Sequence, residues 1–223
     1  MTVPSWLQPL ADAIPHVQGE HFTRFLPPDD SGRASAVLVL FGEGADGPDL
    51  LLIERAATLR SHAGQPAFPG GAQDPEDDGP IAAALREATE EVGLDPTTVE
   101  VLGILPALWL PPSNFVVHPV VAWWHAPHPV DVVDEGEVAA VVRVPLSELT
   151  DPENRFRVVH PSGFTGPAFQ VRGLMVWGFT AGLLAGILTL AGWERPWDSS
   201  RTRELDPETV RLAARTWQTR EST

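Results

Sequence analysis

Three glutamates on one predicted helix constrain this chain more than any other feature. Glu87, Glu90 and Glu91 stand at i, i+3 and i+4 of the octet 86–93, so a helix places them on one side, within about a third of a turn. Like charges at this spacing repel, at about 0.2–0.5 kcal/mol for each pair, and the helix dipole is negative in the last turn. A solvated acidic face, with Arg86 paired to Glu90, is one explanation. A hard divalent cation, which prefers oxygen ligands, is the other, and the neighbouring sequence favours it.

The sequence around the glutamates predicts a helix over residues 80–92. Pro80 suits a first helical position, and Gly93 suits the position just after a helix. One side of this helix carries an apolar stripe made of Ile81, Ala84, Leu85, Ala88 and Val92. The stripe predicts which side packs on the core, and the glutamates lie on another side.

A glycine-rich loop and an acidic loop precede this helix, and together the three segments resemble the Nudix box. Residues 68–71 read Phe-Pro-Gly-Gly, and the acidic loop contains Asp74, Glu76, Asp77 and Asp78. The box has the pattern G-x5-E-x7-R-E-U-x-E-E-x-G-U, where U is a bulky aliphatic residue. Arg86 through Leu94 match it, apart from the small Ala88 at a U position. Counting back from Arg86 gives Asp78 and Ala72 where the box has Glu and Gly, so the loop is one residue longer, and Glu76, Asp77 and Asp78 compete for the place of the box glutamate.

The segment before the box resembles the signature of the coenzyme A pyrophosphatases, a Nudix subfamily. That signature is L-L-T-x-R-(S/A)-x3-R-x3-G-x3-F-P-G-G, and residues 51–71 match it with Ile53 in place of Thr. The resemblance implies that the substrate is bound by Arg55, Arg60, Gly64 and Phe68.

The same segment has chemistry suited to phosphate. No acid lies between Glu54 and Asp74, whereas Arg55, Arg60 and His62 do, in a chain of formal net charge -15. Arginine forks match phosphate oxygens bidentately. Arginines paired with surface acids, and a solvent-facing His62, are the alternatives.

These residues predict metal-assisted hydrolysis of a phosphoanhydride. Glu87 and Glu91 are expected to hold Mg²⁺ or Mn²⁺, with Glu90 as a further ligand or an orienting group, and the resemblance adds the main-chain carbonyl of Gly70. The carboxylate that accepts the proton of the attacking water is left open between Glu87, Glu135 and Glu137. Arg86 is expected to brace the glutamates.

The Nudix resemblance and the pattern of apolar runs predict an α/β fold, an α/β/α sandwich with a mixed sheet. We expect a helix-and-loop extension over 1–33, a Nudix domain over 34–193, and a charged tail with a helix over 194–223. Strands are expected at 34–41, 50–54, 99–105, 115–123, 138–144, 155–160 and 168–177, and a further helix at 179–190.

Composition limits the remaining functions. An acidic chain is unsuited to nucleic acid, whose backbone favours Lys and Arg. The absence of cysteine excludes disulfides and thiolate metal sites and fits the cytoplasm, and residues 1–10 do not form a signal peptide. Residues 173–193 carry no charge and are about long enough to span a bilayer, but they divide into a buried strand and an apolar helix, so we expect no stable membrane insertion. A homo-oligomer is compatible with the sequence.

Three functions follow, in order of support. The first is hydrolysis of coenzyme A to 4'-phosphopantetheine and adenosine 3',5'-bisphosphate, a small-molecule reaction favoured by the segment from Arg55 to Gly64. The second is a Nudix hydrolase acting on ADP-ribose or NADH. The third is a domain that binds a nucleotide without turnover, against which the intact Arg-Glu and Glu-Glu pairs argue.

Overall fold

The computed structural model shows two sheets and the helices that cover them, and it describes residues 3–19, 22, 32–59, 62–110, 113–207 and 209–210. The larger sheet is built from β1 (Arg33–Gly44), β2 (Gly47–Arg55), β3 (Pro66–Ala67), β4 (Gly70–Ala72), β5 (Val99–Ile104), β6 (Leu108–Leu110), β7 (Phe115–Trp124) and β8 (Val138–Pro145). The smaller sheet is built from β9 (Arg155–Val159), β10 (Thr165–Val171), β11 (Leu174–Val176) and β12 (Thr202–Glu204). The helices are α1 (Gln8–Ala13), η1 (Ile14–His16), α2 (Pro80–Val92), η3 (Pro96–Thr98), α3 (Leu146–Leu149), η4 (Pro152–Asn154) and α4 (Gly178–Leu190).

The larger sheet is mixed, as predicted. β1 pairs in parallel with β7 along most of its length, whereas its other side pairs antiparallel first with β4 and then with β2. The remaining pairs are antiparallel, including β8 with β2 and β5 with β7. β1 therefore changes its partner midway, and this change brings the glycine-rich β4 beside the middle of the sheet.

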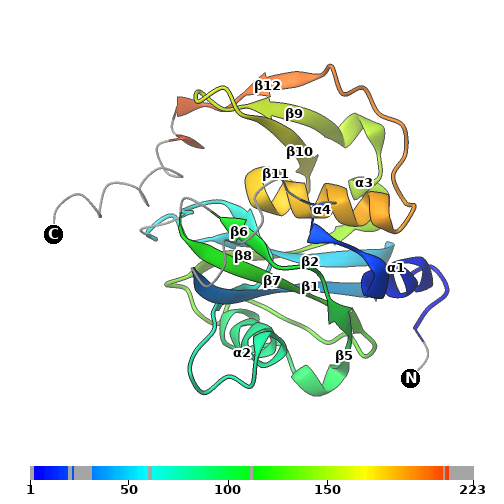
Figure 1. The fold of residues 1–223 in the computed structure, drawn as a ribbon, viewed down its shortest axis with the longest axis vertical. Coiled ribbons are helices and arrows are strands. Elements are labelled where there is room, and N and C mark those ends of the chain that lie inside the picture. The colour runs from blue at the N-terminus through cyan, green and yellow to red at the C-terminus, as the bar shows by residue number, and fades with distance from the viewer. Residues whose placement is uncertain are drawn as a thin grey trace, which may run out of the picture.

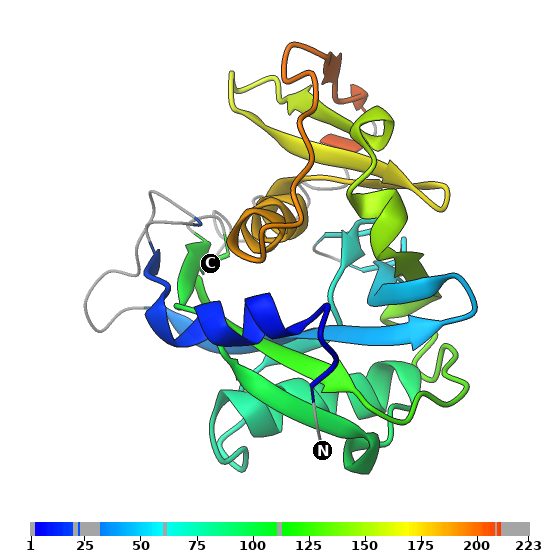
Figure 2. The same cartoon turned by 90° about the vertical axis from the view of Figure 1, so that its right-hand side faces the viewer.

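Helices cover both faces of the larger sheet, which confirms the predicted α/β/α sandwich (Figure 1). Alternate β1 side chains face opposite layers: Leu38 and Leu40 pack with α2, whereas Val39 and Phe41 pack with α1 and α4. Figure 2 shows α1 and α4 on one side of the sheet and α2 on the other.

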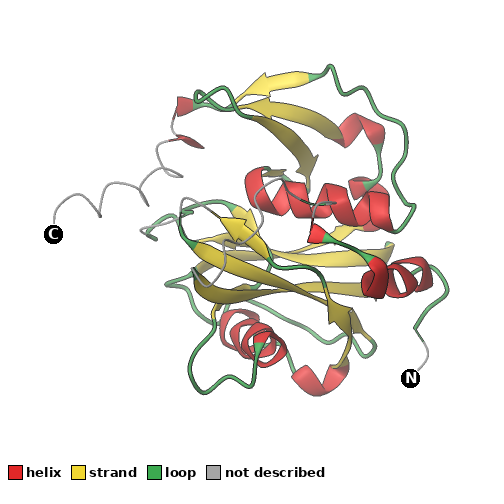
Figure 3. Cartoon of the chain, viewed as in Figure 1, coloured by secondary structure: helices red, strands yellow, loops and turns green. Residues whose placement is uncertain are grey.

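The smaller sheet lies on the far side of α4 and was not predicted (Figure 3). The stretch 168–177, expected as a single strand, is a hairpin, because Arg172 and Gly173 both have positive φ and form a two-residue turn between β10 and β11. α4 therefore packs between two sheets. This accounts for the uncharged stretch 173–193, and within the described residues every helix is too short or too polar to cross a bilayer.

Trp6, just before α1, packs against aromatic side chains of the larger sheet and of the segment after α4. Trp6 contacts the rings of Phe41, Trp123 and Trp193 at centroid distances of 6.2, 5.8 and 5.8 Å. Its Nε1 donates a hydrogen bond to Glu43. The predicted boundaries at residues 33 and 193 stay predictions.

The segment after Trp193 is attached to the smaller sheet through a buried arginine. Arg155 pairs with Glu194 at 2.8 Å, and its guanidinium carbon lies 5.1 Å from the Phe169 ring centroid and 4.7 Å from that of Trp197. β12 then pairs in parallel with β9. The expected tail thus contributes a strand to the fold, whereas the helix expected after residue 206 lies almost entirely outside the described residues.

The close approach of β4 to β1 requires glycine at position 70. Gly70 has a φ of 151°, and an added Cβ would overlap the carbonyl oxygen of Ala36 on β1. We predict that Gly70→Ala lowers the free energy of unfolding by about 2 kcal/mol or more, because strained backbone and a backbone clash add. Denaturant unfolding of the metal-free protein measures this change.

Gly182→Ala is the matched control for this substitution. Gly182 lies inside α4, and an added Cβ there meets no atom within 4 Å. We expect this variant to be as stable as the wild type or up to about 1 kcal/mol more stable, because alanine is the better helix former. Equal stability of the two variants would contradict the predicted constraint at Gly70.

Candidate active site

The turn at β4 brings main-chain atoms against the carboxylates of α2. Gly70 N donates a hydrogen bond of 2.9 Å to Oε2 of Glu91. A Cβ at Gly71 would overlap the carboxylate of Glu87. The two glycines therefore allow β4 and the glutamates, about twenty residues apart in sequence, to lie in contact.

Glu91 is a buried carboxylate with an incomplete set of partners. The residue is 2% exposed, and its Oε1 is buried without a hydrogen-bond partner in the described part of the chain. Burial raises the pKa of Glu91 to about 8, although the hydrogen bond from Gly70 and the charge of Arg55 act in the opposite direction. An unsatisfied buried oxygen of this kind is costly, so it indicates a missing partner.

Glu87 and Glu137 extend the negative field around Glu91. Burial raises the pKa of Glu87, while Arg86 lowers it, and the negative charges of Glu90 and Glu137 raise it further. Glu87 and Glu137 also raise the pKa of Glu91. The structure thus brings a loop carboxylate, forty-six positions after Glu91, into the electrostatic range of the helix.

Arg86 braces this group from the outside, as predicted from its pattern. Its Nε and Nη2 each donate a hydrogen bond of 3.0 Å to Asp77, Nη1 donates one of 2.9 Å to Glu90, and Nη2 donates one of 3.1 Å to Glu87. Nη2 also reaches the carbonyl of Ala72 at 3.1 Å. The Glu90 side chain is 59% exposed, so it lies on Arg86 at the surface and not beside Glu91. Its assignment as a metal ligand stays a prediction.

Two acids of the loop pair with Arg86: Asp77 at 3.0 Å and, more distantly, Asp74 at 3.7 Å. The hydrogen bonds from Arg86 are the main reason that the pKa of Asp77 is lowered. Asp77 follows Gly71 with five residues between them, as in the box, so the extra loop residue lies between Asp77 and α2. The same spacing from Gly70 gives Glu76, so the sequence alone does not select between these two acids, and the match to the box glutamate stays a prediction.

Arg55 points toward the acidic group from the end of β2. The pairing of β2 with β8 shifts register between Glu54 and Arg55. Nη1 of Arg55 lies 3.8 Å from Oε1 of Glu91, and Nη2 lies 3.8 Å from Oε2 of Glu137. These separations exceed hydrogen-bond length, and the buried Nε of Arg55 has no hydrogen-bond partner among the described residues. The guanidinium and the facing carboxylate thus both retain unused hydrogen-bonding capacity.

The other predicted substrate-binding residues have different surroundings. Gly64, with a φ of 67°, donates its N–H to the carbonyl of Arg55 at 2.9 Å and so fixes the backbone beside that arginine. Phe68 is 2% exposed and packs in the core beneath α4. In this structure it is a core residue that anchors the glycine loop, and it has no exposed surface for a substrate. Arg60 lies outside the described residues.

His62 adds little positive charge to this segment. Burial lowers the pKa of His62, and its Nδ1 lies 3.0 Å from the amide oxygen of Gln65. The predicted cationic character between residues 54 and 74 therefore depends on arginine.

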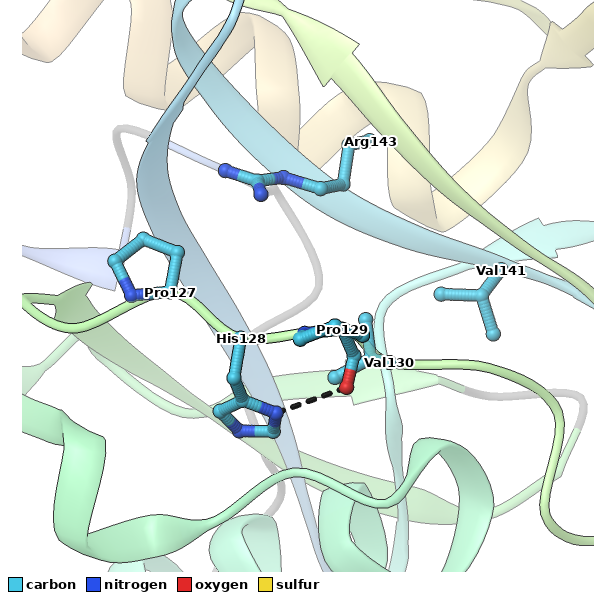
Figure 4. Close-up of a pocket in the computed structure, with 6 residues that line it drawn as sticks. All are labelled: Pro127, His128, Pro129, Val130, Val141 and Arg143. Atoms are coloured by element: carbon cyan, nitrogen blue, oxygen red, sulfur yellow. Dashed lines mark hydrogen bonds between the residues drawn. The ribbon is translucent and has the colours of Figure 1, made fainter.

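A hollow of about 490 Å³ lies elsewhere and contains none of the acidic group. It is bounded by residues 127–130 and by Val141 and Arg143 of β8 (Figure 4). Arg143 is already engaged there, with Asp49 at 2.7 Å and with the Trp124 ring at 5.0 Å. We therefore place the candidate active site at Glu91 and not in this hollow.

The donor set at Glu91 fits a hard divalent cation. Glu87 and Glu91 offer carboxylate oxygens, and one of these, Oε1 of Glu91, is buried with no hydrogen-bond partner among the residues described. In the described part of the chain, no group of three or more acidic or histidine side chains lies close enough together to hold a metal ion by itself. Mg²⁺ suits an open set of this kind, because it usually keeps several waters and takes one or two carboxylates together with substrate phosphates.

Comparison with known proteins assigns the family. A sequence model of the NUDIX domain matches residues 31–161. The Nudix hydrolase NudL of Citrobacter koseri is 39% identical over 197 residues, covering 82% of this chain and 92% of the relative. NudL of Cronobacter sakazakii is 43% identical over 171 residues, covering 74% and 85%. The crystal structure of RenU, a Nudix hydrolase from M. smegmatis, has a TM-score of 0.52 at 18% identity, covering 77% of this chain and 99% of RenU, and supports the fold.

The chain therefore belongs to the Nudix hydrolases. Members of this family are enzymes that generally use divalent metal ions and bind small-molecule nucleotide substrates.

The raised pKa of Glu91 predicts how stability depends on pH. Glutamate titrates near 4.5 when unperturbed and near 8 in the folded protein. Between these values the folded protein holds a proton that the unfolded chain has released, so the free energy of unfolding falls as pH rises. One such group contributes at most about 1.4 kcal/mol per pH unit. We expect Glu91→Gln to flatten this fall between pH 5 and 8, measured by urea unfolding with a chelator present.

Glu76→Gln is the control for this measurement. Glu76 lies exposed in the acidic loop, fifteen residues before Glu91 in the sequence. This variant should keep the pH slope of the wild type. Identical slopes for all three proteins would show that Glu91 ionises in the folded state as it does in the unfolded chain.

Proposed function

We propose that this enzyme hydrolyses the pyrophosphate bond of coenzyme A to 4'-phosphopantetheine and adenosine 3',5'-bisphosphate, with Mg²⁺ or Mn²⁺. The observation that supports this best is the position of Arg55: its two Nη atoms lie 3.8 Å from Glu91 and Glu137, and its buried Nε has no hydrogen-bond partner among the described residues. Arg55 belongs to the segment whose spacing resembles the coenzyme A pyrophosphatase signature. A polyphosphate placed there would meet a cation in a chain of net charge -15.

In this proposal the residues divide into three tasks. The carboxylates of Glu87 and Glu91 and the main-chain carbonyl of Gly70 hold the cation, and Arg55 binds a phosphate of the substrate. Arg86 keeps Glu87 in place, and Asp77 and Glu90 keep Arg86 in place. When bound, the cation stabilises charge on the pyrophosphate oxygens and lowers the pKa of a bound water.

Glu137 is the carboxylate that we assign as proton acceptor. The water oxygen bonds to one phosphorus, the bridging P–O bond breaks, and the proton of the water passes to the carboxylate. Glu137 forms an ion pair with Arg55 and is 48% exposed, so it combines contact with the site and access to water. Glu135 is exposed in the same loop, and Glu87 is engaged by Arg86.

Hydrolysis of another nucleoside diphosphate derivative, such as ADP-ribose or NADH, is the second candidate. The same acidic group and Arg55 would serve it, because the scissile bond is the same. Binding without turnover is less well supported, because the pairing of Arg86 with Glu87 and the burial of Glu91 are intact. Cytoplasmic location and a homo-oligomeric state stay predictions.

A substrate panel tests the proposal directly. Coenzyme A, ADP-ribose, NADH and a nucleoside triphosphate are incubated separately with Mg²⁺ or Mn²⁺, and the products are separated chromatographically. We expect coenzyme A to give 4'-phosphopantetheine and adenosine 3',5'-bisphosphate at the highest kcat/KM of the four. Hydrolysis of ADP-ribose with coenzyme A untouched would support the second candidate instead.

Variants of the glutamates test the division of tasks. Glu91→Gln should lower kcat by about a hundredfold or more, because it removes an electrostatic stabiliser of the transition state, whereas Glu76→Gln should keep wild-type turnover. Added Mn²⁺ should raise the Tm of the wild type by mass action, and the Tm of Glu91→Gln should respond less.

Glu137→Gln separates metal binding from proton transfer. The Tm of this variant should rise with Mn²⁺ as in the wild type, while its kcat falls and loses dependence on one ionisation. Full turnover by Glu137→Gln would show that Glu87 or Glu135, and not Glu137, accepts the proton of the attacking water.

A further inference from the structure

A second hollow, of about 170 Å³, lies where the edge strand β11 of the smaller sheet meets β3 of the larger sheet. One wall comes from Glu54 at the end of β2 and from residues 63–66. The opposite wall comes from residues 173–175, Trp177 and Thr209. The hydroxyl of Thr180, in the first turn of α4, donates a hydrogen bond of 3.0 Å to the carbonyl of Pro66 and so ties the two walls together.

This hollow adjoins the candidate active site through the backbone of β2. Glu54 lines the hollow, and its neighbour Arg55 reaches Glu91 and Glu137. Gly64 and Gln65, which also line the hollow, form backbone hydrogen bonds with Arg55 at 2.9 and 3.0 Å. Side chains alternate along β2, so Arg55 points to the α2 side of the larger sheet and Glu54 to the α4 side. A substrate whose phosphate contacts Arg55 would therefore reach the hollow around the edge of the sheet at β3.

The residues that line the hollow favour a part of the substrate that is uncharged and carries hydrogen-bond donors. Leu174, Met175 and Trp177 supply apolar surface, and the side chains of Glu54 and Gln65 offer oxygen acceptors. Among the described residues that line it, Glu54 is the only ionisable one, and it is an acid. A phosphorylated end would be repelled there, whereas amide N–H groups would be bound.

The two ends of coenzyme A differ in this property. The nucleotide end carries the 3'-phosphate, while the pantetheine arm is uncharged and contains two amides, a hydroxyl and a thiol. The hollow is smaller than the roughly 300–1,000 Å³ of sites that enclose whole ligands, so it suits part of one end.

We propose that the hollow between β3 and β11 binds the pantetheine arm of the substrate, with Met175 and Trp177 as its apolar contacts and Glu54 as an acceptor for an amide. This inference depends on the proposed function. It assigns a specificity role to the smaller sheet, because the NUDIX match ends at residue 161 and Met175 lies beyond it.

Methyl NMR provides the test, because the chain has only two methionines, Met1 and Met175. Protein labelled with [methyl-¹³C]methionine is titrated, with Mg²⁺ present, with 4'-phosphopantetheine and separately with adenosine 3',5'-bisphosphate. We expect the Met175 resonance to shift with 4'-phosphopantetheine and to stay in place with adenosine 3',5'-bisphosphate. The reverse result would place the nucleoside end in the hollow and overturn the inference.

Turnover of coenzyme A by the same sample separates the two proposals. If coenzyme A is hydrolysed while 4'-phosphopantetheine leaves the Met175 resonance unmoved, the hollow is misassigned and the proposed function stands. If coenzyme A is not hydrolysed, the proposed function fails and this inference fails with it.

A substitution that fills the hollow gives a second, kinetic readout. Met175→Trp should lower kcat/KM for coenzyme A about tenfold, because added bulk excludes part of the arm, while inhibition by adenosine 3',5'-bisphosphate keeps its wild-type constant. Phe164→Trp is the control, since Phe164 is 55% exposed in the loop between β9 and β10 and does not line the hollow. Weaker inhibition by adenosine 3',5'-bisphosphate in Met175→Trp, with the coenzyme A kinetics unchanged, would overturn the inference.

Discussion

The burial of one carboxylate, that of Glu91, organises the site. Removing a charged group from water is costly unless partners replace the water, and among the described residues Glu91 accepts one main-chain hydrogen bond, from Gly70. That donor is in place only because β4 approaches β1 closely, which requires glycine at position 70. The close approach of β4 to β1 therefore links three features. These are the strained backbone at Gly70, the change of the partner of β1 from β4 to β2, and the raised pKa of Glu91.

Two separate groups of charges surround this carboxylate. Arg86 is saturated with acceptors from the acidic loop and from α2, so it serves as a fixed brace. Arg55 keeps a buried donor, its Nε, that has no hydrogen-bond partner in the part of the chain that the structure describes. Two arginines of similar exposure thus have different capacities to bind a new anion, and the difference comes from the number of acceptors already in contact with each.

Local patterns predicted the elements that depend on local interactions. The bounds of α2 follow from Pro80, Gly93 and an apolar stripe, and the structure has the helix over the predicted residues. The smaller sheet could not be predicted in the same way, because β12 joins β9 across more than forty residues. The two-residue turn at Arg172 and Gly173 could have been read from the sequence, but the apolar run through it resembles one strand.

In the candidate site, too, the sequence predicts which residues come together but not how each side chain is oriented. The resemblance grouped the three glutamates of α2, but their directions depend on what each contacts: Glu91 turns to Gly70, and Glu90 turns to Arg86 at the surface. Phe68 matches a substrate-binding signature and nevertheless lies in the core, because a sequence pattern does not separate residues that hold a loop from residues that touch a ligand.

α4 is apolar on both of the sides that it presents to the sheets, and its position has a consequence for how small a foldable fragment can be. A chain that stopped at residue 161 would contain the matched NUDIX region but would lose α4, β10 and β11. The side of the larger sheet that carries Val39, Phe41 and Trp123 would then face water without its main cover. We therefore expect the minimal autonomous unit to be longer than residues 31–161, because the residues after 161 cover a face of the larger sheet.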